Sequence, residues 1–291
     1  GSEMCIRDRP EVELIMQGEG EETFTRLVEA CECGTEVCFS ELPGIVLRRS
    51  DGTIEVHRPA PLMNLDDIPF SYGDLSGLEH RIIYYESSRG CPFSCSYCLS
   101  SIDKKVRFRS LSLVTRELQF FLDRKVPQVK FVDRTFNCKK SHSMAIWQYL
   151  LEHDNGITNF HFEISSDLLD DDELALMKQM RPGLIQLEIG VQTTNLMVVK
   201  EIRRTMDLDK VARRVAQVNT FGNIHQHLDL IAGLPYEDYD SFRRSFADVY
   251  ALRPQQLQLG FLKVLRGSFM YEHTEEYDCH YQEREPYEVL Y

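Results

Sequence analysis

From Arg81 onward the chain alternates between short apolar stretches with a two-residue period and longer stretches with helical periodicity. The short stretches predict six strands and the longer ones predict five helices between them. The predicted strands are residues 82–86, 128–133, 159–164, 184–191, 223–231 and 255–262, and the predicted helices lie around 112–124, 141–152, 170–180, 207–220 and 239–252. Repeated strand–helix units of this kind predict an α/β fold with a parallel sheet.

The polar residues of these strands occupy alternate positions, so they lie on one face of each strand. Because side chains point to opposite faces along a strand, helices should cover the apolar face and the polar face should point inward. A closed eight-stranded barrel normally fills its interior with Val, Ile and Leu. The polar interior therefore predicts a wider, open barrel that holds a polar ligand. The inward set is His161, Glu163, Gln186, Glu188, Gln192, His225, His227, Asp229, Gln256 and Gln258.

Composition narrows the class of protein. With 291 residues, of which 43% are hydrophobic, the chain can build one large domain and part of another. A net charge of −13 argues against a nucleic-acid partner, since that affinity depends on Lys and Arg. No apolar run reaches the roughly 18 residues of a membrane span. Nine cysteines without an apolar signal segment indicate a reducing, cytoplasmic location.

Three of those cysteines, Cys91, Cys95 and Cys98, follow a predicted strand on one short loop. Thiolates at this spacing can converge on one iron–sulfur cluster. Three are present where four would close a cluster, so one iron would stay open for a ligand. The alternatives are a structural zinc knuckle, a disulfide loop or chance, but zinc normally uses two such pairs or added histidines.

The loop resembles the CxxxCx(aromatic)C motif of the radical S-adenosylmethionine (SAM) enzymes, with Tyr97 in the aromatic position. The resemblance implies a four-iron four-sulfur cluster on the three cysteines, with SAM chelated to the open iron. Reductive cleavage of SAM would then yield a 5′-deoxyadenosyl radical. The resemblance also implies a partial (β/α)6 barrel, which agrees with the open polar barrel predicted from the strands.

The same resemblance implies contacts for SAM. Glu163, Gln192 and Asp229 match positions around the ribose and the amino-acid group, and Arg204 matches a residue that meets the carboxylate. The family's glycine-rich turn for the ammonium is absent, and Asp133 could take its place. Glu163 and Asp229 could instead pair with Arg or His inside the barrel. No catalytic residue can be named, and the three barrel histidines are better explained as hydrogen-bonded interior residues.

The chain before the barrel predicts further segments. Residues 1–9 resemble an assembly artefact. Residues 10–40 resemble the last βα unit of a doubly wound cobalamin-binding domain, with Glu19 and two flanking glycines as contacts. This remnant implies cobalamin as a cofactor of the full-length protein, not bound by the fragment itself. The remaining segments are a hairpin and linker (41–79), the radical SAM barrel (80–270) and the start of a truncated C-terminal region (271–291).

Four further cysteines have open roles. Cys31, Cys33 and Cys38 could form part of an auxiliary cluster, although free cysteine is also a common buried small hydrophobe. Cys138 could be a thiol on the substrate side or a structural residue.

The resemblance implies a radical SAM enzyme, with cobalamin-dependent methylation or rearrangement as the expected reaction of the full-length protein. The alternatives are hydrogen abstraction without cobalamin and a non-catalytic iron–sulfur or SAM sensor. The expected reductant is a flavodoxin or ferredoxin. The substrate stays open.

Overall fold

The structure, a computed structural model, describes residues 6, 9–32 and 42–290. The chain divides into two compact units, residues 1–69 and 70–291. Most of the suspected artefact, as well as Cys33 and Cys38, lies outside the described residues. Within the described ranges, none of the helices combines the length and the apolar character that a bilayer crossing requires.

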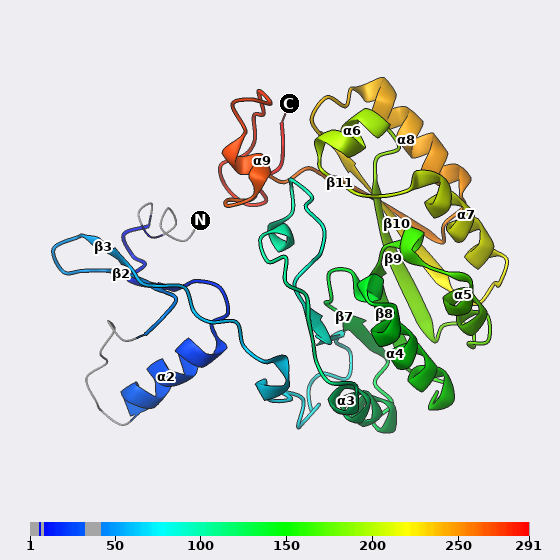
Figure 1. The fold of residues 1–291 in the computed structure, drawn as a ribbon, viewed down its shortest axis with the longest axis horizontal. Coiled ribbons are helices and arrows are strands. Elements are labelled where there is room, and N and C mark those ends of the chain that lie inside the picture. Colours follow the sequence, from blue (N-terminus) through cyan, green and yellow to red (C-terminus); the bar gives the residue numbers. More distant parts are fainter. Residues whose placement is uncertain (1–5, 7–8, 33–41, 291) are drawn as a thin grey trace. The chain divides into compact units, whose positions relative to one another are not determined.

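The first unit contains a three-stranded antiparallel sheet and one longer helix (Figure 1). Gly52 has a φ of +84° and Asp51 accepts a hydrogen bond from the Thr53 backbone at 2.9 Å, so a turn at these residues closes the predicted hairpin. The elements are β1 (Leu14–Met16), α2 (Glu21–Glu32), β2 (Ile45–Arg48), β3 (Ile54–Val56) and the short helix η2 (Leu65–Asp67).

β1 and the hairpin were predicted in separate segments of the chain, whereas the structure joins them in one sheet. Leu14 pairs with Leu47 across β1 and β2, and the Gln17 N–H donates to the Gly44 carbonyl at 2.6 Å. A lone strand would leave its backbone groups without partners, and the hairpin supplies them. Glu19, expected as a cobalamin contact, accepts a hydrogen bond from the backbone N–H of Met63 at 2.7 Å.

The second unit contains the predicted six-stranded parallel sheet. The strand order is β11-β10-β9-β8-β7-β4, so each successive strand of this sheet lies beside the one before it in the chain. The strands β4 and β11 are the two edges, and the barrel is therefore open, as predicted. The strands are β4 (Ile83–Tyr85), β7 (Gln128–Phe131), β8 (Asn159–Ile164), β9 (Ile185–Gln192), β10 (His225–Ala232) and β11 (Gln256–Phe261).

Helices cover the apolar face of this sheet (Figure 1). Burial along β9 alternates residue by residue, with Ile185, Leu187, Ile189 and Val191 buried. The strand residues predicted to point inward therefore face away from the helices and into the barrel. The helices are α3 (Leu111–Asp123), α4 (Lys140–Glu152), α5 (Asp171–Met177), α6 (Leu196–Glu201), α7 (Leu208–Asn219), α8 (Tyr239–Ala251) and α9 (Phe269–Glu272).

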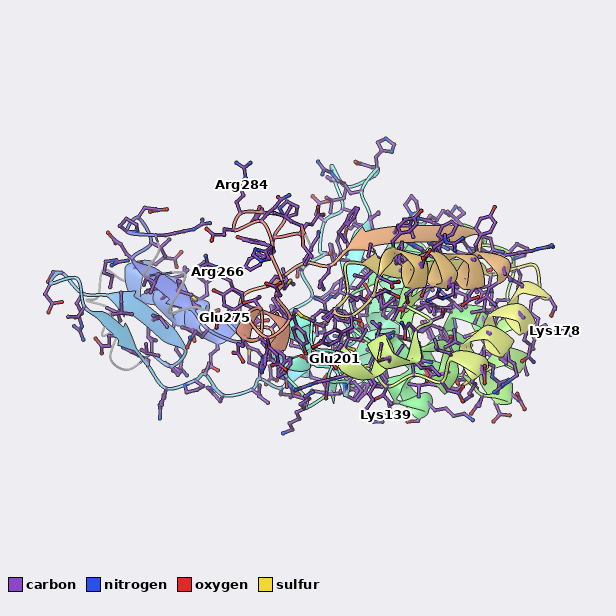
Figure 2. All side chains as sticks on the ribbon, turned by 90° about the horizontal axis from the view of Figure 1, so that it is seen from above. Lys139, Lys178, Glu201, Arg266, Glu275 and Arg284 are labelled. Carbon is purple, nitrogen blue, oxygen red and sulfur yellow. The ribbon has the colours of Figure 1, made fainter. Side chains whose placement is uncertain are left out.

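Four of these helices begin at an Asp or Asn whose side chain accepts backbone hydrogen bonds of the first turn. The caps are Asp170, Asn195, Asp207 and Asp238. At the other end of α5, Lys178 is exposed, as is Lys139 at the start of α4 (Figure 2). The polar positions of the sequence thus separate into caps, solvent-facing charges and barrel interior.

Short elements complete the second unit around the cysteine loop. β5 (Ser88–Arg89) pairs with β6 (Arg107–Phe108), and η3 (Leu99–Ser101), η4 (Phe136–Cys138) and η5 (Ser166–Leu168) are single turns. The segment after β11 returns to the barrel, where the Val289 N–H donates to the Leu262 carbonyl at 2.9 Å.

Candidate active site

The three cysteines of the loop line one pocket of the barrel. Cys91 and Cys95 are buried, and Cys98 is partly exposed. Gly90 precedes them with a φ of +99°, and a Cβ at this position would lie 2.7 Å from the Lys105 carbonyl oxygen. Only glycine fits there, because both its conformation and its space exclude a side chain.

The loop is held in place from two sides. Ser96, fully buried between the second and third cysteines, donates its N–H to the Ile202 carbonyl at 2.9 Å. Its carbonyl accepts the N–H of Met270, also at 2.9 Å. Ile202, Met270 and three other apolar residues form a small core against which Tyr97 packs. The end of α6 and the start of α9 therefore fix the loop backbone.

Tyr97 and four of the five predicted SAM contacts line the same pocket as the cysteines. They come from different parts of the chain: the loop, the C-terminal ends of β8, β9 and β10, and the segment after α6. The C-terminal end of a parallel barrel is where such folds place their sites. The five residues are Tyr97, Glu163, Gln192, Arg204 and Asp229.

A bulge in β9 directs Gln192 into the pocket. Asp229 of β10 lies opposite Gly190, but Leu230 lies opposite Gln192, so Val191 is an extra residue. Gln192 has a φ of +72°, and its Oε1 is buried without a hydrogen-bond partner among the described residues. A Cβ at position 190 would collide with the Gln192 side chain. The Gly-Val-Gln sequence therefore builds a site that presents a free amide oxygen.

Arg204 lies against the cysteine loop. Its Nη1 donates to Tyr97 Oη at 3.2 Å and to Cys95 Sγ at 3.7 Å, and its Nη2 donates to the Gly190 carbonyl. Burial raises the pKa of the Tyr97 phenol, which keeps it protonated. One guanidinium thus connects the loop to the β9 bulge.

Asp133, the predicted partner of the SAM ammonium, is not among the residues that line this pocket. Its side chain is fully buried and accepts hydrogen bonds from Ser87 N–H at 3.0 Å, Ser87 Oγ at 2.7 Å and Ser88 Oγ at 2.5 Å. Burial raises the pKa of this carboxyl to about 6 despite these donors. Because its partners are Ser88 of β5 and the preceding residue Ser87, Asp133 anchors the start of the strand before the cysteine loop.

The barrel interior holds a network of charged side chains that includes Glu163 and Glu188 of the pocket lining. Lys130 Nζ lies 2.8 Å from Glu188 and 3.7 Å from Glu163, and His161 Nε2 lies 2.8 Å from Glu188. His161 and Lys130 together lower the pKa of Glu188 to about 2, whereas burial raises that of Glu163. Glu163 therefore pairs with a cation inside the barrel. The sequence had suggested Arg or His as this partner, and the structure shows Lys130.

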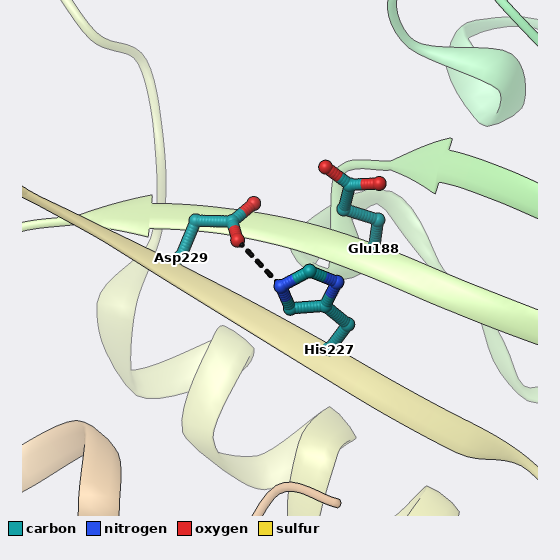
Figure 3. A group of neighbouring side chains, drawn as sticks. All are labelled: Glu188, His227 and Asp229. Atoms are coloured by element: carbon teal, nitrogen blue, oxygen red, sulfur yellow. Dashed lines mark ion pairs between the residues drawn. The ribbon is translucent and has the colours of Figure 1, made fainter. Parts of the chain in front are cut away.

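Glu188, His227 and Asp229 place their ligand atoms within 4.8 Å of one another (Figure 3). His227 Nε2 lies 3.0 Å from Asp229 Oδ1, and this carboxylate raises the pKa of the imidazole. Such a set could hold a metal ion. The Lys130 ammonium beside Glu188 already supplies the positive charge that a cation would bring.

Lys130, Arg134 and Thr135 were not among the predicted residues, although the last two line the pocket. Lys130 pairs in register with His161 and shares its parity, so the alternation could have identified it. Cys138 is absent from the pocket lining, and burial raises the pKa of its thiol to about 11. Cys31 is exposed.

Comparison with known proteins places this site in a wider group. The sequence profile of the Radical SAM superfamily matches residues 85–249. The uncharacterized methyltransferase PH0819 of Pyrococcus horikoshii is 26% identical over 81% of this chain and 52% of its own length. The cobalamin-dependent radical SAM methyltransferase TokK of Streptomyces tokunonensis is 27% identical over 80% of this chain and 36% of its own. The chain thus spans about half or less of these relatives.

Solved structures show the same fold. The radical SAM methyltransferase TsrM of Kitasatospora setae superposes with a TM-score of 0.76 over 91% of this chain and 54% of its own, at 16% identity. The cobalamin-dependent SAM radical enzyme OxsB gives a TM-score of 0.66 over 96% of this chain and 40% of its own, at 18% identity.

Proposed function

Because the chain belongs to the radical SAM superfamily, we propose that Cys91, Cys95 and Cys98 hold a four-iron four-sulfur cluster and that the adjoining pocket binds SAM. The observation that carries this proposal is the convergence of three thiols and a partnerless buried amide oxygen, Gln192 Oε1, in one pocket. When bound, a cluster with three protein ligands leaves one iron open to SAM and supplies the electron for its reductive cleavage.

The pocket residues suit the groups of SAM. Gln192 Oε1 and the carboxylates of Asp229 and Glu163 accept hydrogen bonds, as ribose hydroxyls and an ammonium require. Arg204 keeps one Nη2 hydrogen and its Nε–H free of described partners, and both suit a carboxylate. Tyr97 packs the loop against the small core and closes that side of the pocket.

We further propose that the longer protein containing this chain is a cobalamin-dependent methyltransferase or a related rearranging enzyme. The methyltransferases among its relatives support this choice. Hydrogen abstraction without cobalamin would use the same pocket. A pure sensor would need no polar barrel interior beyond the SAM pocket. A flavodoxin or ferredoxin is the proposed electron donor, in the reducing cytoplasm where such clusters persist.

Anaerobic reconstitution with iron and sulfide tests the cluster. The natural sequence should hold one oxygen-labile four-iron cluster, measured by iron and sulfide content and by electron paramagnetic resonance (EPR) of the reduced form. Cys91→Ser, Cys95→Ser and Cys98→Ser should each abolish it, whereas Cys138→Ser and Cys31→Ser serve as matched controls and should retain it. A normal cluster in Cys95→Ser would refute the assignment.

Dithionite reduction of the loaded protein tests the pocket. SAM should be converted slowly to 5′-deoxyadenosine and methionine, detected by chromatography. Asp229→Ala should weaken SAM binding several-fold with an unchanged cluster spectrum, since a lost hydrogen bond costs on the order of 1 kcal/mol. A loaded cluster that neither binds nor cleaves SAM would favour the sensor.

A further inference from the structure

Arg204 is one of the two arginines among the described residues that line the barrel pocket. Its three acceptors are the Cys95 sulfur, the Tyr97 hydroxyl and the Gly190 carbonyl, and it makes no ion pair with a carboxylate among the described residues. Arg134, which also lines the pocket, is exposed to solvent. A partly buried guanidinium without a counter-anion is costly, so an anion is expected at this place.

The nearest anionic group that the site can supply is the thiolate form of Cys95. We infer that Arg204 is a positioning residue whose N–H donates to the Cys95 thiolate of the bound cluster and thereby makes that cluster easier to reduce. This inference rests on the proposed function, because it concerns the cluster that the three cysteines hold.

The direction of the effect follows from charge. Reduction adds one electron to a cluster whose thiolates already carry negative charge, so the reduced form gains more from a nearby cation than the oxidised form. Hydrogen bonds to the sulfurs and net charge are the terms that set iron–sulfur potentials. The guanidinium also donates to the Tyr97 hydroxyl and the Gly190 carbonyl, and these two contacts keep its N–H directed at the sulfur.

The experiment is an EPR-monitored redox titration of the reconstituted protein without SAM. At the potential where the natural cluster is half reduced, Arg204→Met should lower the ratio of reduced to oxidised cluster about tenfold, equivalent to about 59 mV for a one-electron couple. Arg204→Lys keeps the charge but loses the planar fork, and should lower the ratio less. Arg203→Met is the matched control, because Arg203 is exposed and stacks on the Phe269 ring, and its ratio should be unchanged.

Two results would overturn the inference. One is an unchanged ratio in both Arg204 variants, even if SAM binding weakens, since Arg204 would then serve SAM alone. The other is loss of the cluster from both variants while Arg203→Met loads normally, because Arg204 would then build the site instead of tuning it. Failure of the natural protein to load any cluster would refute the proposed function itself.

Discussion

At the scale of single residues, Ser87 joins two buried titratable side chains just before the cysteine loop. Its hydroxyl donates to Asp133 at 2.7 Å and lies 3.0 Å from His142 Nε2. Burial lowers the pKa of His142 to about 4. The imidazole is therefore neutral in the folded protein throughout the physiological range.

This burial predicts a pH dependence of stability. Between pH 6.5 and about 4 the unfolded chain binds a proton at position 142 that the folded chain does not, so the contribution of His142 is full above pH 6.5 and is lost as the pH falls. The difference in unfolding free energy between the natural protein and His142→Gln should therefore decrease by about 1–2 kcal/mol from pH 7 to pH 5, measured by urea unfolding. His153→Gln, at an exposed position, should show no such change. A difference in unfolding free energy that does not change with pH would contradict the burial of a neutral imidazole.

At the scale of elements, the β9 bulge couples a glycine to the pocket. A methyl group at position 190 would meet the far end of the Gln192 side chain, which can rotate away at little cost to the fold. Gly190→Ala should therefore weaken SAM binding several-fold, the loss that we also expect of Gln192→Ala, with stability changed by less than about 1 kcal/mol. Equilibrium dialysis with SAM and urea unfolding measure the two quantities.

Gly260 of β11 provides the control for this substitution. A Cβ there would make only an ordinary contact, 3.8 Å from the Leu230 carbonyl oxygen. Gly260→Ala should leave SAM affinity unchanged. Equal losses in Gly190→Ala and Gly260→Ala would show that the bulge is not what directs Gln192.

The elements also show what sequence patterns can and cannot predict. The two-residue period identified all six barrel strands and the polar interior. Polar and apolar side chains alternate along each strand of a sheet with one polar face, so the sequence shows which residues lie on which face. The bulge at Val191 was not predictable, since it exists only in the register between β9 and β10. The burial of Asp133 depends on Ser87 and Ser88, some 45 residues earlier in the chain. The six-residue α6 was missed because it is too short to show a helical period.

At the scale of the whole molecule, the two units differ in what they can enclose. The second unit brings cysteines, acceptors and charges from many elements to one pocket. The described part of the first unit has one helix beside a three-stranded antiparallel sheet, apart from the single turn η2. A doubly wound domain binds its cofactor at a switch point of a parallel sheet covered by helices on both faces. The described first unit has neither feature.

This difference predicts that residues 10–291 alone bind SAM but not cobalamin. Equilibrium dialysis of the reconstituted protein with hydroxocobalamin should show no micromolar binding. A normal cluster spectrum and normal SAM binding of the same sample would establish that the chain is folded. Glu19 Oε2 already accepts the Met63 backbone N–H at 2.7 Å, so part of its carboxylate is engaged within the first unit. Micromolar binding that Glu19→Ala abolishes would show that residues 10–69 form a cobalamin site after all, and that the boundary between cofactor domain and linker lies elsewhere.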